Sequence, residues 1–171
     1  MSKPIDFSSA TAMEIRNGAP STVVPLEQEV VFTFDKGLPA FEDCTDFVFI
    51  LDESIRPFVC MQSLNNNDLS FICVDPFLIN ANYTARLTDC VTDQLDLQSQ
   101  EDTLVLAVVT VNPDMEKTTA NLMGPIVLNV RNNRAMQVIL EDVEPELVRY
   151  NVMKGIEALE VIEKARESCA G

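Results

Sequence analysis

The chain has 171 residues, of which 47% are hydrophobic, enough to build one compact domain with some peripheral extension. It carries 12 Lys+Arg against 27 Asp+Glu and no histidine, so its formal net charge is -15. Such a surface repels nucleic-acid phosphates and anionic membranes, and we expect neither as a direct partner. A basic protein partner is favoured, because complementary charge speeds and orients the encounter. The alternative is that the acidity only keeps the protein soluble.

The cysteines indicate a reducing compartment and therefore a cytoplasmic location. There are five, an odd number, and no two are close in sequence. Three of them, Cys60, Cys73 and Cys90, lie in or beside apolar runs, which predicts buried free thiols. Without histidine or a close cysteine pair, no structural zinc site is expected. We also find no secretory signal and no run of about 20 apolar residues that could span a bilayer.

The first half of the chain predicts a flexible leader followed by several short strands. Residues 1–22 are polar and mixed, without a sustained period. Gly37 and Pro39 mark a turn after the first strand, and an Asn-rich turn joins two later strands into a hairpin. A continuous apolar run at 47–51 reads as a strand buried on both faces. The expected strands are 28–34, 47–51, 57–63 and 70–74.

The second half predicts more strands and then a helix. Between 80 and 99 the pattern is weak, allowing a half-exposed strand near 83–87 and a short helix from Thr88 to Leu95. The unbroken β-branched run at 103–111 indicates a buried central strand. Residues 118–130 read as one β segment bent at Gly124 and Pro125, and 134–140 as the last strand. Apolar residues at three- and four-residue spacing predict an amphipathic helix from about Pro145 to about Ser168, weakened by Gly155.

Together these elements predict a mainly β fold: an antiparallel barrel-like or roll domain of about eight short strands with a C-terminal amphipathic helix. Every connection is short, which argues against parallel crossovers. We divide the chain into a leader at 1–22, a barrel-like domain at 23–143 and a terminal helical segment at 144–171, packed on the domain or extending from it.

The residues argue against catalysis. The chain has no histidine, so it lacks both the commonest general base and the usual partner of a serine or cysteine nucleophile. Five scattered glycines supply no phosphate-binding loop. Adjacent carboxylates such as Asp52 and Glu53 are usually solvated surface charge, although a carboxylate-dependent enzyme remains an alternative. We therefore expect a binding protein without a cofactor or a metal.

Read in order, five motifs resemble those of the flagellar assembly factor FliW family. They are FDKGLPAFE at 34–42, PFVCMQS at 57–63, FICVDP at 71–76, TANLMGPIVLN at 119–129 and MQVIL at 136–140. Order and spacing agree over about residues 24–150. Ala40 stands where the family pattern usually has glycine, so that turn is expected to differ. The leader and much of the terminal helix extend beyond the common core.

The resemblance implies a non-enzymatic regulator of flagellar assembly. Members of the family bind CsrA, a small basic homodimeric translational regulator, and relieve its repression of flagellin synthesis in a non-competitive mode toward RNA. They also bind flagellin. Direct mimicry of RNA is the other possible mechanism, and a flagellin-specific secretion chaperone without CsrA binding is the alternative function.

We expect part of the contact surface on acidic loops, at Pro39, Phe41, Glu42, Asp43 and Asp75. The competing interpretation is that Phe41 belongs to the core and the acids are merely solvated. Within the matched motifs, Gly37, Leu38, Asn121, Gly124, Pro125 and Asn129 are expected to have structural roles. For Asn121 we favour a side chain that hydrogen-bonds the backbone beside the bend over a contact with a partner.

Overall fold

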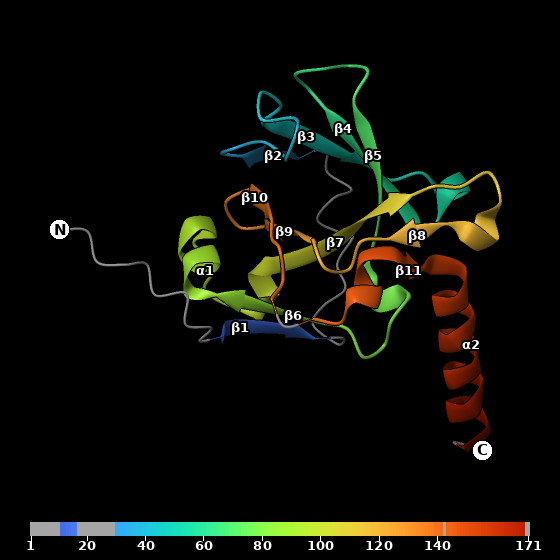
Figure 1. Cartoon of the computed structure of the whole chain (residues 1–171). Helices are drawn as coiled ribbons and strands as arrows, with labels where there is room; N and C mark the ends of the chain where they lie inside the picture. Colours follow the sequence, from blue (N-terminus) through green and yellow to red (C-terminus); the bar gives the residue numbers. More distant parts are fainter. Residues whose placement is uncertain (1–10, 17–29, 142, 170–171) are drawn as a thin grey trace.

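The computed structural model describes residues 11–16, 30–141 and 143–169 and forms a closed β-barrel with attached elements (Figure 1). Seven strands follow one another around the barrel in the order β7, β5, β4, β3, β2, β10, β9, and β9 pairs with β7 to close it. Their bounds are β2 Val31–Phe34, β3 Asp46–Ile50, β4 Phe58–Ser63, β5 Ser70–Val74, β7 Thr103–Thr110, β9 Ile126–Asn129 and β10 Arg134–Gln137. The mainly β barrel with a C-terminal helix is confirmed.

One barrel pairing is parallel, although the short connections predict antiparallel pairing only. Strand β10 lies alongside β2 in the same direction, with Arg134 opposite Thr33 and Ala135 opposite Phe34. The other six pairings around the barrel are antiparallel. The parallel pair needs no dedicated crossover, because most of the chain, including the helix Asp89–Leu95, lies between the two strands. The short connections seen locally in the sequence say nothing about pairing at that distance.

One hydrophobic core lies on each side of β7. Leu104 and Leu106 point into the barrel, where phenylalanines of β2 and β3 fill much of the interior. Val105, Ala107 and Val109 point outward into a second core beneath β6 (Thr84–Thr88), α1 (Asp89–Leu95) and the segments that follow β10. Both faces of β7 are therefore dry, as its unbroken apolar run predicts.

The stretch 118–130 forms two strands rather than one bent strand. Short strand β8, Thr119–Ala120, pairs with β7 and with β11, Tyr150–Asn151, and a turn then leads to β9. The Asn121 carboxamide oxygen accepts the backbone N–H groups of Met123 and Gly124, at 3.1 and 3.0 Å. Asn121 therefore holds the turn through its side chain. Pro125 lies beyond the turn, and its carbonyl accepts the Val138 N–H at 2.8 Å.

Three further expectations are corrected. Residues 11–16 of the supposed flexible leader form strand β1, Thr11–Arg16, which pairs with β6; positions 1–10 and 17–22 lie outside the described residues. The terminal helix α2 is Val152–Cys169 rather than beginning near Pro145, because Pro145–Arg149 forms a separate 3-10 helix and β11 follows it. Cys90 is exposed on α1, whereas Cys73 is fully buried and Cys60 half-buried.

The remaining elements are short 3-10 helices between strands. They are η2 Glu53–Ile55, η3 Pro76–Leu78, η4 Gln100–Asp102, η5 Met115–Lys117 and η6 Pro145–Arg149. Three of them, η2, η3 and η5, begin at an aspartate whose carboxylate accepts a backbone N–H of the first turn. Aspartate is favoured at such positions because it satisfies donors that the turn leaves free.

Candidate partner-binding surface

The loop between β2 and β3, residues 35–45, is held in a compact turn by its own backbone. The N–H of Gly37 donates to the Phe34 carbonyl at 2.9 Å, and that of Phe41 to the Leu38 carbonyl at 2.8 Å. Gly37 has a φ of 62°, and a Cβ there would lie 2.6 Å from the Phe41 carbonyl oxygen. Leu38 is buried beneath the loop. Gly37 therefore permits the close turn, and Leu38 anchors the loop in the core.

Four of the five predicted contact residues lie together on this loop. Pro39, Phe41, Glu42 and Asp43 are all exposed. The Phe41 ring is 38% exposed and packs edge-on against Phe71, with centroids 5.6 Å apart. Phe41 therefore packs on the barrel and still exposes part of its ring to solvent. It is neither a fully buried core residue nor a residue held by the loop alone. We call Pro39, Phe41, Glu42 and Asp43 the acidic loop.

Asp75 does not join this surface. It is 3% exposed, and its carboxylate accepts the Phe77 N–H at 2.9 Å, capping η3. It follows the end of β5 that lies away from Phe71, the residue that Phe41 contacts. A buried carboxylate already engaged with the backbone has no free face for a partner. The structure therefore places Asp75 in the framework of the fold.

Ala40 adopts a left-handed backbone conformation, with φ at 70°. This is the conformation that glycine takes at little cost and alanine at about 1 kcal/mol or more. Its N–H donates to the Glu42 carboxylate at 3.2 Å, which fixes one oxygen of Glu42 and leaves the other toward solvent. The turn is formed with alanine in place, so the departure from glycine appears as local strain.

The sequence reading missed an apolar surface on the outside of β2 and β3. Strand β3 was expected to be buried on both faces, but Ile50 is 47% exposed, and Val31 on β2 is 40% exposed. Val31 pairs with the half-buried Val48, so these three form one patch, the outer apolar face. The available signal was the alternation of phenylalanine with aliphatic residues, because inward phenylalanines leave Val31, Val48 and Ile50 pointing outward.

Negative charge surrounds the acidic loop and the outer apolar face. Between residues 30 and 68 the sequence has seven carboxylates and two cations, Lys36 and Arg56. Arg56 contacts Glu53 at 3.4 Å, and Asp35 contacts Arg134 at 2.6 Å. Asp52 lies just beyond the outer apolar face, and hydrogen bonds from the Ser54 backbone N–H and hydroxyl lower its pKa. This side of the barrel therefore stays strongly acidic at neutral pH.

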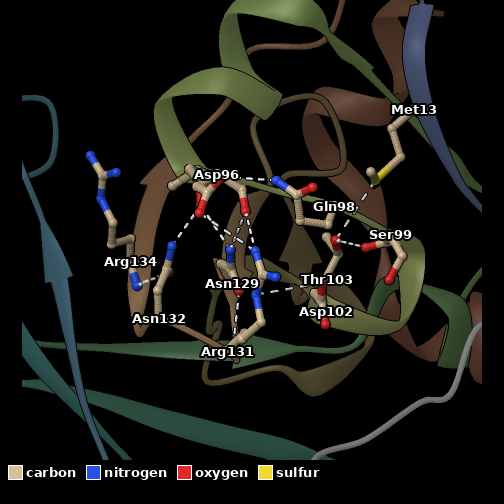
Figure 2. Close-up of polar contacts among 11 residues, drawn as sticks. Met13, Asp96, Gln98, Ser99, Asp102, Thr103, Asn129, Arg131, Asn132 and Arg134 are labelled. Atoms are coloured by element: carbon tan, nitrogen blue, oxygen red, sulfur yellow. Dashed lines mark hydrogen bonds and ion pairs between the residues drawn. The ribbon is translucent and has the colours of Figure 1, made fainter.

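A polar network joins α1 to the hairpin of β9 and β10 (Figure 2). Asn129 is fully buried; its amide nitrogen donates to the carbonyls of Leu95 and Asp96 at 2.8 and 3.0 Å. Its oxygen accepts the Arg131 N–H at 2.9 Å. The Arg131 guanidinium also donates to the Asp96 carbonyl, at 3.0 Å. Asn129 thus links the β9–β10 hairpin to the end of α1.

In the part of the chain that the structure describes, no group of three His, Cys, Asp or Glu side chains could hold a metal ion. Within the same residues, no helix is both long and apolar enough to cross a membrane.

Comparison with known proteins gives one consistent family. The family model described as FliW protein matches residues 19–152 of this chain. The flagellar assembly factor FliW of Treponema pallidum (strain Nichols) is 41% identical over 115 residues, covering 67% of this chain and 76% of that protein. The protein of the same name from Bacillus subtilis (strain 168) is 35% identical over 117 residues, covering 68% and 82%. A crystal structure of the flagellar assembly factor FliW superimposes with a TM-score of 0.68 at 30% identity, covering 73% of this chain and 86% of that one.

Proposed function

This chain belongs to the FliW family of flagellar assembly factors, and we propose that it binds and antagonises the translational regulator CsrA in the cytoplasm. The family assignment gives it a role in flagellar assembly and places it among assembly factors rather than enzymes. Antagonism of CsrA would relieve repression of flagellin translation. Binding of flagellin by the same protein would couple flagellin synthesis to its secretion.

The observation that carries this proposal is the acidic loop that joins β2 to β3, together with the outer apolar face on those two strands. An exposed aromatic edge and aliphatic patch can exclude water at the centre of an interface, while surrounding carboxylates attract a basic partner. A small basic RNA-binding dimer has the complementary charge. The contact therefore requires neither a deep pocket nor a cofactor.

We favour a mode in which this protein and RNA contact different faces of CsrA. The acidic protein would then disfavour RNA by electrostatic repulsion or a change of shape, without occupying the RNA-binding face. Titration of CsrA with this protein at rising concentrations of a flagellin leader RNA distinguishes the mechanisms. A saturating effect of RNA on the apparent dissociation constant is expected, whereas a rise proportional to RNA concentration would establish direct competition.

Charge reversal tests the acidic loop itself. We expect Glu42→Lys with Asp43→Lys to weaken CsrA binding by about tenfold or more, because each removes an attraction and adds a repulsion. The matched control is Asp93→Lys with Glu101→Lys, two exposed acids elsewhere that change the net charge equally. Glu42→Gln removes the charge but keeps the loop conformation, since its amide oxygen can still accept the Ala40 N–H. Equal effects of the two double variants would remove the acidic loop from the interface.

Flagellin binding is measured separately with the same variants. Loss of CsrA binding with flagellin binding intact would indicate separate surfaces, and loss of both would indicate a shared one. Wild-type protein that binds flagellin but not CsrA would replace the proposed function with that of a flagellin-specific chaperone.

A further inference from the structure

The loop between β2 and β3 is held at its base by the hairpin of β4 and β5, which lies at the same end of the barrel (Figure 1). The base itself is closed by the Phe34 N–H, which donates to the Thr45 carbonyl at 2.7 Å. The side-chain oxygen of Asn65, in the turn of the hairpin, accepts two consecutive backbone N–H groups, those of Thr45 and Asp46, both at 2.9 Å. The C-terminal end of the loop is therefore fixed by a side chain from another element.

The turn that carries Asn65 is braced by its own side chains. The hydroxyl of the buried Ser63 accepts the N–H groups of Asn65 and Asn66, both at 3.1 Å. The side-chain nitrogen of Gln62 donates to three carbonyls of the same hairpin, at 3.0, 3.1 and 3.2 Å. These bonds hold the turn in one conformation, so the Asn65 oxygen is a fixed point for the neighbouring loop.

The same hairpin supports the middle of the loop through an aromatic contact. Phe41 packs edge-on against Phe71 of β5, and Phe71 in turn packs against the fully buried Phe47, with ring centroids 6.4 Å apart. Glu42 and Asp43 lie between Phe41 and the end of the loop that Asn65 holds. Loss of the Asn65 contact would therefore free the exposed ring and both acids to move.

Such support matters for binding, because a loop that is already ordered loses less conformational entropy when a partner docks. Two hydrogen bonds of ordinary strength correspond together to roughly a tenfold change in an equilibrium constant. Loss of both Asn65 bonds is therefore large enough to populate disordered forms of the loop without unfolding the barrel.

We propose that Asn65 is a positioning residue for the acidic loop. Its side-chain oxygen holds the loop in the conformation in which Phe41, Glu42 and Asp43 meet a basic partner. The inference rests on the proposed function for the identity of that partner, CsrA, whereas the order of the loop is a property of the free protein. Asn65 acts through the backbone of Thr45 and Asp46 and needs no contact with the partner itself.

Three variants of the full chain isolate this role. Asn65→Ala removes the acceptor of both N–H groups, and Asn65→Asp keeps an oxygen in the same place. Asn66→Ala is the matched control, because the Asn66 side-chain oxygen accepts the Asp68 N–H at 3.0 Å within the turn. Asn65 and Asn66 are both exposed, so all three variants should remain folded in urea unfolding followed by circular dichroism.

The first measurement is amide hydrogen exchange by NMR in the free protein. The N–H groups of Phe41 and Cys44 report on the whole loop, because they donate to the Leu38 and Phe41 carbonyls at 2.8 and 3.0 Å. We expect Asn65→Ala to speed exchange at both amides by about tenfold, and Asn66→Ala by less than about twofold.

The second measurement is titration of each variant with CsrA. Asn65→Ala should weaken binding by about tenfold, and Asn66→Ala by less than about twofold. Asn65→Asp should restore binding to within about threefold of the wild-type value, because a carboxylate oxygen can accept the same N–H groups. A residue that only stabilised the barrel would lower the free energy of unfolding and leave these affinities unchanged.

Several results would overturn the proposal. Faster exchange confined to Thr45 and Asp46 would show that Asn65 orders only the amides that it binds. Equal affinities of the Asn65→Ala and Asn66→Ala variants for CsrA would separate binding from this contact, and failure of Asn65→Asp to restore binding would exclude the side-chain oxygen as the cause. A wild-type chain that does not bind CsrA would instead refute the proposed function, and the exchange rates with the same titrations against flagellin would then decide the role of Asn65.

Discussion

Replacing Asn129 with alanine should destabilise the barrel strongly, because this buried side chain makes three hydrogen bonds to the backbone. Each such bond contributes roughly 1 kcal/mol net. The loss is moderated by second donors: Asn132 also donates to the Leu95 carbonyl, and Arg131 to the Asp96 carbonyl. The backbone N–H of Arg131 is left unpaired. We therefore expect Asn129→Ala to lower the free energy of unfolding by about 2–3 kcal/mol.

The assay is urea unfolding followed by circular dichroism, with thermal unfolding as a second measurement. For a chain of this size, a loss of 2–3 kcal/mol corresponds to a fall in Tm of roughly 5–10 °C. Asn132→Ala is the matched control, because Asn132 lies in the same network but is exposed. It should cost less than about 1 kcal/mol.

Asn129→Asp provides a sharper comparison at nearly constant volume. It replaces the donor that faces two carbonyls with an oxygen and introduces a buried charge, so it should cost more than the alanine variant. A loss below about 1 kcal/mol for Asn129→Ala, or a loss equal to that of Asn132→Ala, would refute the assignment of Asn129 as the anchor of this network.

Ala40→Gly should raise the free energy of unfolding by roughly 0.5–1 kcal/mol in urea titrations, because relief of the left-handed strain exceeds the entropy added to the unfolded chain. Gly155→Ala should lower Tm although alanine favours helix, since its Cβ would collide with the Ile79 carbonyl; unchanged Tm would contradict that close approach. In pulsed alkylation, exposed Cys90 should react at once and buried Cys73 only after unfolding. Burial raises the pKa of the Cys73 thiol to about 12 from 9.0. The contribution of the buried thiol to the free energy of unfolding is therefore complete below pH 9 and falls as pH rises toward 12. Cys73→Ala should reduce this fall in unfolding titrations.

The sequence by itself determined the strands that are apolar on a regular period and the residues with local roles. The run at β7 predicted a strand with two dry faces, and two cores now lie on either side of it. Gly37 and Asn121 each act on backbone within five residues of themselves. Such local effects are encoded in a few adjacent residues.

Tertiary structure decided which strands became neighbours and which surfaces stayed uncovered. The residues near β10 do not indicate its parallel pairing with β2. Asp75 has the sequence context of an exposed loop carboxylate, and only the folded structure shows that it is buried. The α2 helix reads as amphipathic, yet among its described residues only Val152 and Gly155 are buried and Ile156 packs against the core. A periodic pattern shows which side of an element is apolar. What covers that side depends on segments distant in sequence, and here most of the apolar side of α2 is left uncovered by the described part of the chain.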